Sequence, residues 1–309
     1  MPTSKNRISR LIKDTAYELG FEACGITKAG PLVKESEVFR SWLKDGCHGS
    51  MAYMNRNVDK RLNPMLLNEW ANSLIMVMYN YFPADQILSE GNYKISKYAY
   101  GKDYHEVIKH KLKEIVDAIE DEMGEILARV FVDSAPVMEK AWAQKCGLGW
   151  MGKNSCLINK KKGSFHFIGT IVTNLELNYD EEEATDHCGN CTKCMDACPN
   201  GAITSAGVID ARKCISYLSI EHKGKFKPED AGKLHGWIFG CDICQDVCPW
   251  NRFAKAHQEP EFMPSQQLLG MSDQDWEVLD EATFKALFKG TAVERTGFDA
   301  LRRNIESGK

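Results

Sequence analysis

Apolar residues recur at helical spacing in three stretches of the chain. The first runs from Ile8 to Leu19, with apolar side chains three and four residues apart, and is followed by Gly20, a residue type that often ends helices. The second covers residues 105–123 and the third residues 137–145. We therefore predict three helices, each with one face against a core.

Short apolar runs between these helices predict buried strands over residues 74–78, 129–132, 156–158 and 165–173. A Lys-Lys-Lys-Gly turn at residues 160–163 is expected to join the last two strands. Helices and strands mixed in this way predict an α+β domain over residues 1–178.

The remainder of the chain differs in composition. The acidic run 180–183 has no apolar periodicity and is expected to lead into a cysteine-rich module over residues 179–258. Residues 259–309 are polar and helical in pattern, and Phe284, Leu287 and Phe288 form a small apolar face. We expect this last segment to be a C-terminal helical tail.

The chain has 309 residues, of which 43% are hydrophobic, and a formal net charge of −4. This composition predicts a globular protein, and the charge argues against wholesale binding to polyanions while leaving room for local basic clusters. The sequence shows neither an apolar signal segment nor a run long enough to span a bilayer. We therefore expect a cytoplasmic protein with no membrane partner.

Eight of the twelve cysteines fall between residues 188 and 248, which favours metal or redox chemistry over disulfides. The stretch 188–199 has the spacing C-x2-C-x2-C-x3-C-P, in which three thiolates hold one [4Fe–4S] cluster and the fourth reaches another. The second stretch, 241–249, lacks one close cysteine, and the isolated Cys214 is the replacement. The predicted ligands are Cys188, Cys191, Cys194 and Cys248 for cluster one, and Cys198, Cys214, Cys241 and Cys244 for cluster two.

A pair of zinc sites is the alternative, because four thiolates also suit tetrahedral zinc. The spacing ending in proline is typical of ferredoxins, and so we favour iron. Residues 200–203 are expected to turn back over a cluster and to offer backbone N–H groups to its sulfurs. Such clusters would make the protein a reductase that passes electrons singly.

Six segments, in one order along residues 5–305, closely resemble epoxyqueuosine reductases. They are residues 51–56 (MAYMNR), 96–105 (SKYAYGKDYH), 132–139 (VDSAPVME), 147–154 (GLGWMGKN), 214–221 (CISYLSIE) and 240–245 (GCDICQ). The resemblance implies a cobalamin-dependent enzyme that reduces the epoxide of epoxyqueuosine to the cyclopentene of queuosine, at the wobble position of certain transfer RNAs.

The resemblance also implies an architecture. A nitroreductase-like, cobalamin-binding domain would be followed by a ferredoxin-like double [4Fe–4S] module, with the corrinoid between them. An external one-electron donor would supply the clusters, which would feed cobalt. Many family members continue into helical repeats that help to hold the transfer RNA. This sequence stops at Lys309, so we expect either a short form or a truncated chain, and a monomer.

Asp133 is the predicted catalytic residue. It follows an apolar strand and precedes Ser-Ala-Pro, where a carboxylate can face a cavity and, in a dry pocket, protonate the substrate. The resemblance implies the same role and a contact with cobalamin. The alternative is a helix N-cap, which the residues alone favour.

Five further residues fall in segments that match the corrinoid-contacting ones of the family: Arg56, Lys153, Asn154, Ser216 and Asp242. Each has an alternative. Arg56 and Lys153 are candidates for surface charges, Ser216 for a turn cap and Asp242 for ordering a cluster loop. The glycines of residues 147–152 indicate close backbone approach.

Transfer RNA is a polyanion, so a positive patch is expected. The candidates are Lys160, Lys161 and Lys162, then Lys223, Lys225 and Lys227, then Arg295, Arg302 and Arg303. Lysine runs are more often solvated faces. Phe226 or Tyr217 could stack a splayed base. The rival functions are a corrinoid reductive dehalogenase, an electron carrier without its own substrate, and an RNA-binding protein with structural clusters.

Overall fold

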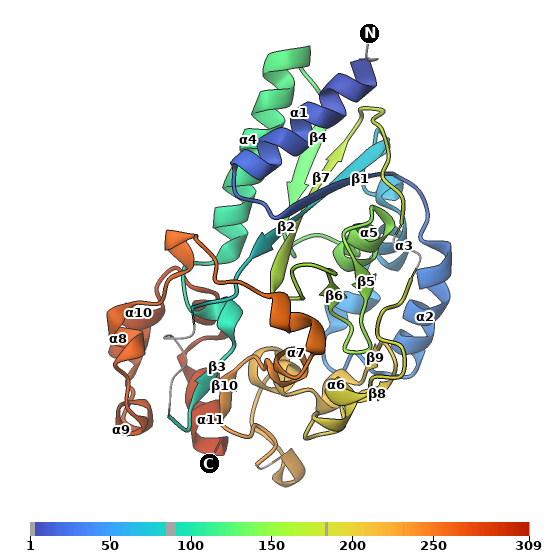
Figure 1. Ribbon diagram of the computed structural model, residues 1–309. Coiled ribbons are helices and arrows are strands. Elements are labelled where there is room, and N and C mark those ends of the chain that lie inside the picture. The colour runs from blue at the N-terminus through green and yellow to red at the C-terminus, as the bar shows by residue number, and fades with distance from the viewer. Residues whose placement is uncertain (1–3, 85–90, 183–184, 231, 309) are drawn as a thin grey trace.

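The computed structural model describes residues 4–84, 91–182, 185–230 and 232–308. An antiparallel four-stranded sheet forms its upper part, in the order β1-β2-β7-β4 (Figure 1). The strands are β1 (Ala23–Lys28), β2 (Ser73–Asn80), β4 (Ala128–Phe131) and β7 (His166–Thr173).

Helices cover both faces of this sheet. On one face lie α1 (Ser4–Glu18) and α4 (Tyr104–Met123), and on the other α2 (Val33–Lys44), α3 (Val58–Leu62) and α5 (Glu139–Lys145) (Figure 1). Successive residues of β2 enter opposite cores, because side chains alternate along a strand. Ile75 and Val77 pack under α1 and α4, whereas Met76 and Met78 pack under α5. This burial on two faces explains why β2 is apolar without interruption.

The three predicted helices are confirmed in place, as α1, α4 and α5, and the predicted strands correspond to β2, β4, β6 (Leu157–Ile158) and β7. The turn predicted between the last two strands does lie between β6 and β7, but these strands do not pair with each other. β6 pairs with β5 (Trp150–Met151), while β7 crosses into the main sheet between β2 and β4. The turn at 160–163 is closed only by a bridge between Asn159 and Gly163.

Residues 174–187 contain no helix or strand where they are described, as expected of a linker, and Glu183 lies outside the described residues. Asp180 is nevertheless fixed to the first domain. Its carboxylate accepts a hydrogen bond from the Ile26 backbone N–H at 2.8 Å and pairs with Lys13 at 2.5 Å.

The glycines of the 147–152 segment mark a close approach between backbone segments, as predicted. A Cβ on Gly149 would lie 2.2 Å from the Ile158 carbonyl oxygen.

The cysteine-rich module consists of short elements around two cysteine loops. Helices α6 and α7 each begin within such a loop, as the repeated sequence pattern requires (Figure 1). The elements are α6 (Lys193–Asp196), β8 (Ile203–Ser205), β9 (Val208–Ile209), a π-helix (Tyr217–Glu221), β10 (Trp237–Phe239) and α7 (Ile243–Asp246).

The C-terminal segment packs against both earlier parts of the chain. Strand β10 pairs in parallel with β3 (Lys94–Ile95), and the apolar face predicted around Phe288 covers this pair. Asn304, fully buried, donates hydrogen bonds to the Ser219 and Ile238 carbonyl oxygens at 2.7 and 2.8 Å. The helices are α8 (Gln266–Leu269), α9 (Asp273–Glu277), α10 (Glu281–Phe288) and α11 (Phe298–Ser307). One apolar cluster joins residues 93–99 of the first predicted domain, 238–239 of the second and 276–305 of the tail. The predicted domain boundaries therefore stay a prediction.

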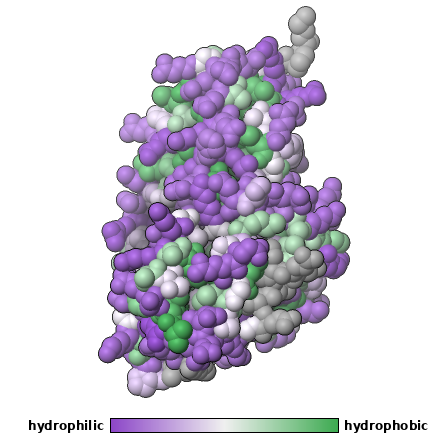
Figure 2. Space-filling model, turned by 90° about the vertical axis from the view of Figure 1, so that its left-hand side faces the viewer, coloured by the Kyte–Doolittle hydropathy of each residue, from purple (hydrophilic) through white to green (hydrophobic). Residues whose placement is uncertain are grey.

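Short 3-10 helices connect many of these elements: Ala52–Asn55, Pro64–Leu66, Lys97–Ala99, Ala211–Lys213, Pro228–Asp230, Pro249–Phe253, Pro260–Phe262 and Ala292–Thr296. Hydrophilic side chains cover most of the face shown in Figure 2, and apolar ones form small patches on it. Within the part of the chain that is described, none of the helices has both the length and the apolar character needed to cross a bilayer.

Candidate active site

Four cysteines from two separate loops line a small cavity of ≈ 40 Å³. They are Cys188, Cys191, Cys194 and Cys248, the ligand set predicted for cluster one. The sulfur of Cys188 accepts a hydrogen bond from the Trp150 indole N–H at 3.5 Å. Three thiols from one loop and a fourth from the other loop, around a shared space, fit a cubane cluster.

The second predicted set also comes together. Cys198 and Cys214 lie close enough to Cys241 to raise the pKa of its thiol, which burial, the largest cause, raises to about 12. The Ala202 backbone N–H donates to the Cys198 sulfur at 3.2 Å, as predicted for the turn over the cluster.

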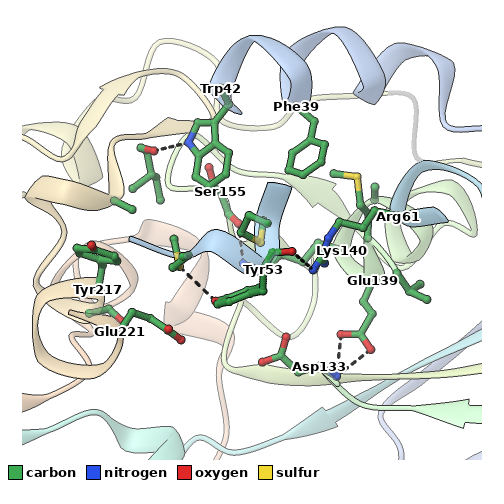
Figure 3. Close-up of a pocket in the computed structure, with 18 of the residues that line it drawn as sticks. Phe39, Trp42, Tyr53, Arg61, Asp133, Glu139, Lys140, Ser155, Tyr217 and Glu221 are labelled. Atoms are coloured by element: carbon green, nitrogen blue, oxygen red, sulfur yellow. Dashed lines mark hydrogen bonds between the residues drawn. The ribbon is translucent and has the colours of Figure 1, made fainter. Parts of the chain in front are cut away.

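A much larger cavity of ≈ 1730 Å³ lies between the sheet domain and the cysteine-rich module. Typical ligand pockets have about 300–1,000 Å³, so this one has room for a macrocycle together with a nucleoside. One wall carries Asp133 and Glu139, the opposite wall Tyr217 and Glu221, and Tyr53 lies between them (Figure 3). Cys214, a predicted cluster ligand, is part of the lining. The cavity and the second cysteine cluster therefore share a wall.

Asp133 stands just after β4, and its exposed carboxylate faces the cavity. Its backbone has a positive φ of 49°, a conformation that few residues other than glycine adopt. The Tyr104 hydroxyl donates to Asp133 Oδ2 at 2.9 Å, and the Asp133 backbone N–H donates to both oxygens of Glu139, at 2.9 and 3.1 Å. Asp133 does not cap α5, whose N-cap, Met138, has no side-chain cap. The capping alternative is wrong.

Two groups around Asp133 have strongly shifted pKa values. Burial, and then the nearby Asp133 carboxylate, raise the pKa of Glu139 to about 8. Burial and the same carboxylate raise the pKa of Tyr104 well above its usual value, so this hydroxyl stays a donor at neutral pH. The ring of Tyr104 is stacked on Phe167, with centroids 4.1 Å apart and planes 5° apart, which fixes the direction of the donor.

The other predicted contact residues separate into two groups. Arg56 and Ser216 line the large cavity together with Asp133. Lys153 and Asn154 instead lie at the cluster-one cavity, where the Lys153 ammonium donates to the Gly189 and Cys191 carbonyl oxygens at 2.6 and 3.0 Å. The Asn154 side-chain amide donates to the Cys244 carbonyl oxygen at 3.2 Å.

Asp242 is buried behind the second cysteine loop. It accepts hydrogen bonds from the Ser96 hydroxyl and from the Lys97 backbone N–H, and the Lys97 ammonium lies 3.5 Å away. Burial is the largest effect on this carboxyl group and raises its pKa, although Lys97 opposes the shift. These contacts join the cysteine loop to the segment before α4. Corrinoid contact by Lys153, Asn154 and Asp242 stays an untested prediction.

Two of the predicted basic groups reach the cavity, namely Lys223 and Arg295. Arg303 is engaged in the fold, because its guanidinium donates to the His222 and Gly224 carbonyl oxygens at 2.9 and 2.8 Å and lies 4.3 Å from the Phe226 ring centre. The hydroxyl of Tyr217 contacts Ser50 at 2.7 Å. Phe226 therefore has its ring in contact with an arginine, and base stacking by either aromatic residue stays a prediction.

Sequence reasoning missed three residues. Tyr104 and Glu139 lie inside segments that were recognised as similar to the family, and their titratable side chains near Asp133 were the available signal. Cys156 was counted as a scattered cysteine, yet its thiol hydrogen-bonds to Cys244. Nothing in its spacing indicates this contact, because the chain reaches Cys244 through tertiary packing.

Two sets of four cysteines lie beside a large cavity that the Asp133 carboxylate faces. This combination is typical of one class of protein, the iron–sulfur reductases with an internal substrate site. Comparison with known proteins agrees with this class. Residues 187–251 match the family model described as "4Fe-4S double cluster binding domain", and residues 61–134 match "Epoxyqueuosine reductase QueG, DUF1730". The chain thus has a double iron–sulfur cluster domain, which supports iron over zinc.

Whole-chain similarity identifies the family. The chain is 51% identical over 303 residues to an epoxyqueuosine reductase of Cellulophaga algicola, covering 98% of both chains. It superimposes with a TM-score of 0.90 on an epoxyqueuosine reductase crystallised with an epoxyqueuosine-modified tRNA stem loop, at 26% identity and covering 99% of this chain and 81% of that one. A Bacillus subtilis epoxyqueuosine reductase, described with its catalytic loop swung out of the active site, gives 0.88 at 25% identity, covering 99% and 82%. The chain belongs to the epoxyqueuosine reductase family and is an oxidoreductase.

Proposed function

We propose that this protein reduces epoxyqueuosine, at the wobble position of transfer RNA, to queuosine, with cobalamin in the large cavity and electrons from two [4Fe–4S] clusters. The observation that carries the proposal is the position of Cys214. This predicted cluster ligand lies in the wall of the cavity that also contains Asp133. Electrons that reach the second cluster therefore arrive at the wall of the cavity that the Asp133 carboxylate also faces.

The overall reaction needs two electrons and two protons. Both carbon–oxygen bonds of the epoxide break, a carbon–carbon double bond forms, and the oxygen leaves as water. Iron–sulfur clusters transfer one electron at a time, so an external one-electron donor must deliver twice for each turnover. The two clusters can hold one electron each, and the cavity has the space for a further group that passes both electrons to the substrate.

Cobalamin fits the residues that are present. The cavity of ≈ 1730 Å³ exceeds the size of ordinary ligand pockets, and Arg56 and Ser216 offer polar groups on its walls. When bound, cobalamin would supply a reduced cobalt centre as the electron-rich group that acts on the epoxide. Lys153, Asn154 and Asp242 are proposed to act through the loops that they hold beside it.

Asp133 is the proposed proton donor. Its carboxylate is exposed to the cavity, while Tyr104 binds one of its oxygens and leaves the other free to face substrate. Closure of the cavity by cofactor and RNA would exclude bulk water, so that a proton on this carboxyl group passes directly to the substrate. The catalytic loop named for the Bacillus subtilis relative supports a catalytic role for a loop in this fold.

Transfer RNA is the proposed carrier of the substrate. Lys223 and Arg295 line the cavity and would contact phosphates on either side of an extruded wobble nucleotide. The structure of a relative with a modified tRNA stem loop supports this partner. We propose that the protein acts as a monomer in the cytoplasm, where transfer RNA is processed.

The test compares Asp133→Asn with Asp121→Asn, a matched change on the exposed surface of α4. Both variants are reconstituted anaerobically with iron, sulfide and cobalamin. The expected result is that Asp133→Asn binds cobalamin with the wild-type absorption spectrum and loses turnover, while Asp121→Asn keeps both. Full turnover by Asp133→Asn would refute the proton-donor role.

A further inference from the structure

Asp133 has a left-handed backbone conformation, which is uncommon for a residue other than glycine. Its φ of 49° lies in the left-handed region, where a side chain with a Cβ is strained. A contact to the Asp133 backbone would help to hold this conformation.

Glu139 provides this contact. Both of its carboxyl oxygens accept the Asp133 backbone N–H, at 2.9 and 3.1 Å. In Figure 3 the Asp133 carboxylate turns away from the Glu139 carboxylate and into the cavity. Holding the N–H from one side thus leaves the Asp133 side chain pointing to the other side.

Glu139 does not act as the acidic partner of an ion pair. Among the described residues, no lysine, arginine or histidine nitrogen forms an ion pair with it. Lys140 and Lys109 act on it only at longer range, and Asp133 opposes its charge. Within the described part of the chain, the hydrogen bonds of this half-buried carboxyl group come from the Asp133 backbone N–H.

Taking this geometry together with the proposed function, on which the inference rests, we propose that Glu139 is a positioning residue that holds the Asp133 loop with the Asp133 carboxylate aimed into the cavity. Tyr104 adds a second contact, because its hydroxyl donates a hydrogen bond to Asp133 Oδ2 at 2.9 Å. Asp133 is then held at its backbone by Glu139 and at its side chain by Tyr104. Removing either anchor releases one end of the residue.

A simpler role is that of an acidic residue in the first turn of α5, where a negative charge favours the helix. Glu106 occupies the equivalent first turn of α4, is exposed, and is not part of the cavity lining. Glu106→Ala is therefore the matched control. Glu139→Gln keeps an oxygen that accepts the N–H and cannot ionise at any pH, so it tests whether the hydrogen bond alone is sufficient.

The experiment uses the full chain, reconstituted with clusters and cobalamin, and RNA that carries epoxyqueuosine. Millisecond hydrogen–deuterium exchange of the Asp133 amide reads the contact directly, and kcat and KM read its consequence. For Glu139→Ala we expect the Asp133 amide to exchange about tenfold faster or more, and kcat to fall by a similar factor, as for a lost hydrogen bond to this carboxyl group. KM and the cobalamin spectrum should stay unchanged. Glu139→Gln and Glu106→Ala should stay close to the wild type.

Three results would overturn the inference: wild-type amide exchange in Glu139→Ala, wild-type kcat in that variant, or a Glu139→Gln variant as impaired as the alanine one. If the alanine variant fails to hold iron, Glu139→Leu takes its place, because it fills the same volume without an acceptor. Failure of the wild type to act on the RNA would refute the proposed function instead, while the exchange measurement would still report whether Glu139 holds the loop.

Discussion

Replacing Glu139 by glutamine should remove a pH-dependent loss of stability. Burial, with the adjacent Asp133 carboxylate, raises the pKa of Glu139 from 4.5 to about 8 in the folded chain, against the smaller opposing effects of Lys140 and Lys109. Between these two values the folded protein keeps a proton that the unfolded chain releases. Stability contributed by this group is therefore lost as the pH rises from about 4.5 to 8, and an uncharged glutamine avoids that loss.

The magnitude follows from the shift. From pH 5 to pH 8 the wild type should lose about 4 kcal/mol relative to Glu139→Gln, at about 1.4 kcal/mol for each pH unit. For a chain of this length that difference corresponds to about 6 °C in Tm. Thermal unfolding of both reconstituted proteins, followed anaerobically by intrinsic fluorescence at half-unit steps of pH, measures it. Glu106→Gln is the control.

A difference in Tm between Glu139→Gln and the wild type that stays constant from pH 5 to pH 8 would contradict the reasoning. It would mean that Glu139 titrates like a solvated carboxyl group and is not held in a buried environment beside Asp133. A difference that shrinks with rising pH would contradict the sign of the effect.

Three further predictions concern separate parts of the molecule. Cys248→Ser should lower the iron content by about half through loss of cluster one, although Cys248 belongs to the second cysteine motif, whereas Cys47→Ser should leave iron unchanged in a colorimetric assay. Tyr104→Phe removes the hydroxyl that binds Asp133 and should lower kcat roughly fivefold with KM unchanged, the effect of about 1 kcal/mol for one hydrogen bond. Leu112→Ala should lower the free energy of unfolding by about 2–5 kcal/mol in urea titration, because the fully buried Leu112 packs between α4 and the sheet.

The local pattern of apolar residues was sufficient to predict the helices that bury one face and the strand that is buried on both faces. The spacing of apolar residues in α1 and α4 and the unbroken apolar run of β2 follow directly from their packing. The register of the sheet did not follow, because β7 takes its partners from β2 and β4, about 95 and 40 residues earlier. A short turn after Ile158 indicated a local hairpin, and only tertiary packing against the main sheet overrides it.

The cysteine part of the site was predictable because the cluster ligands follow a fixed spacing along the sequence. Thiolate ligands need a set separation, and so the sharing of Cys248 with the first motif could be inferred from the sequence. The partners of Asp133 could not be inferred in this way. Tyr104 comes from a helix 29 residues earlier, and Glu139 acts through a backbone N–H, a contact that leaves no pattern in residue types.

The most direct test of the account is mass spectrometry of an anticodon stem-loop RNA that carries epoxyqueuosine, after incubation with the anaerobically reconstituted protein, cobalamin and a strong reductant. The account predicts that the modified nucleoside loses one oxygen atom with the wild type, and that this loss is absent when cobalamin is omitted or Asp133 is replaced by asparagine. RNA that keeps its oxygen in the presence of fully loaded wild-type protein would contradict it.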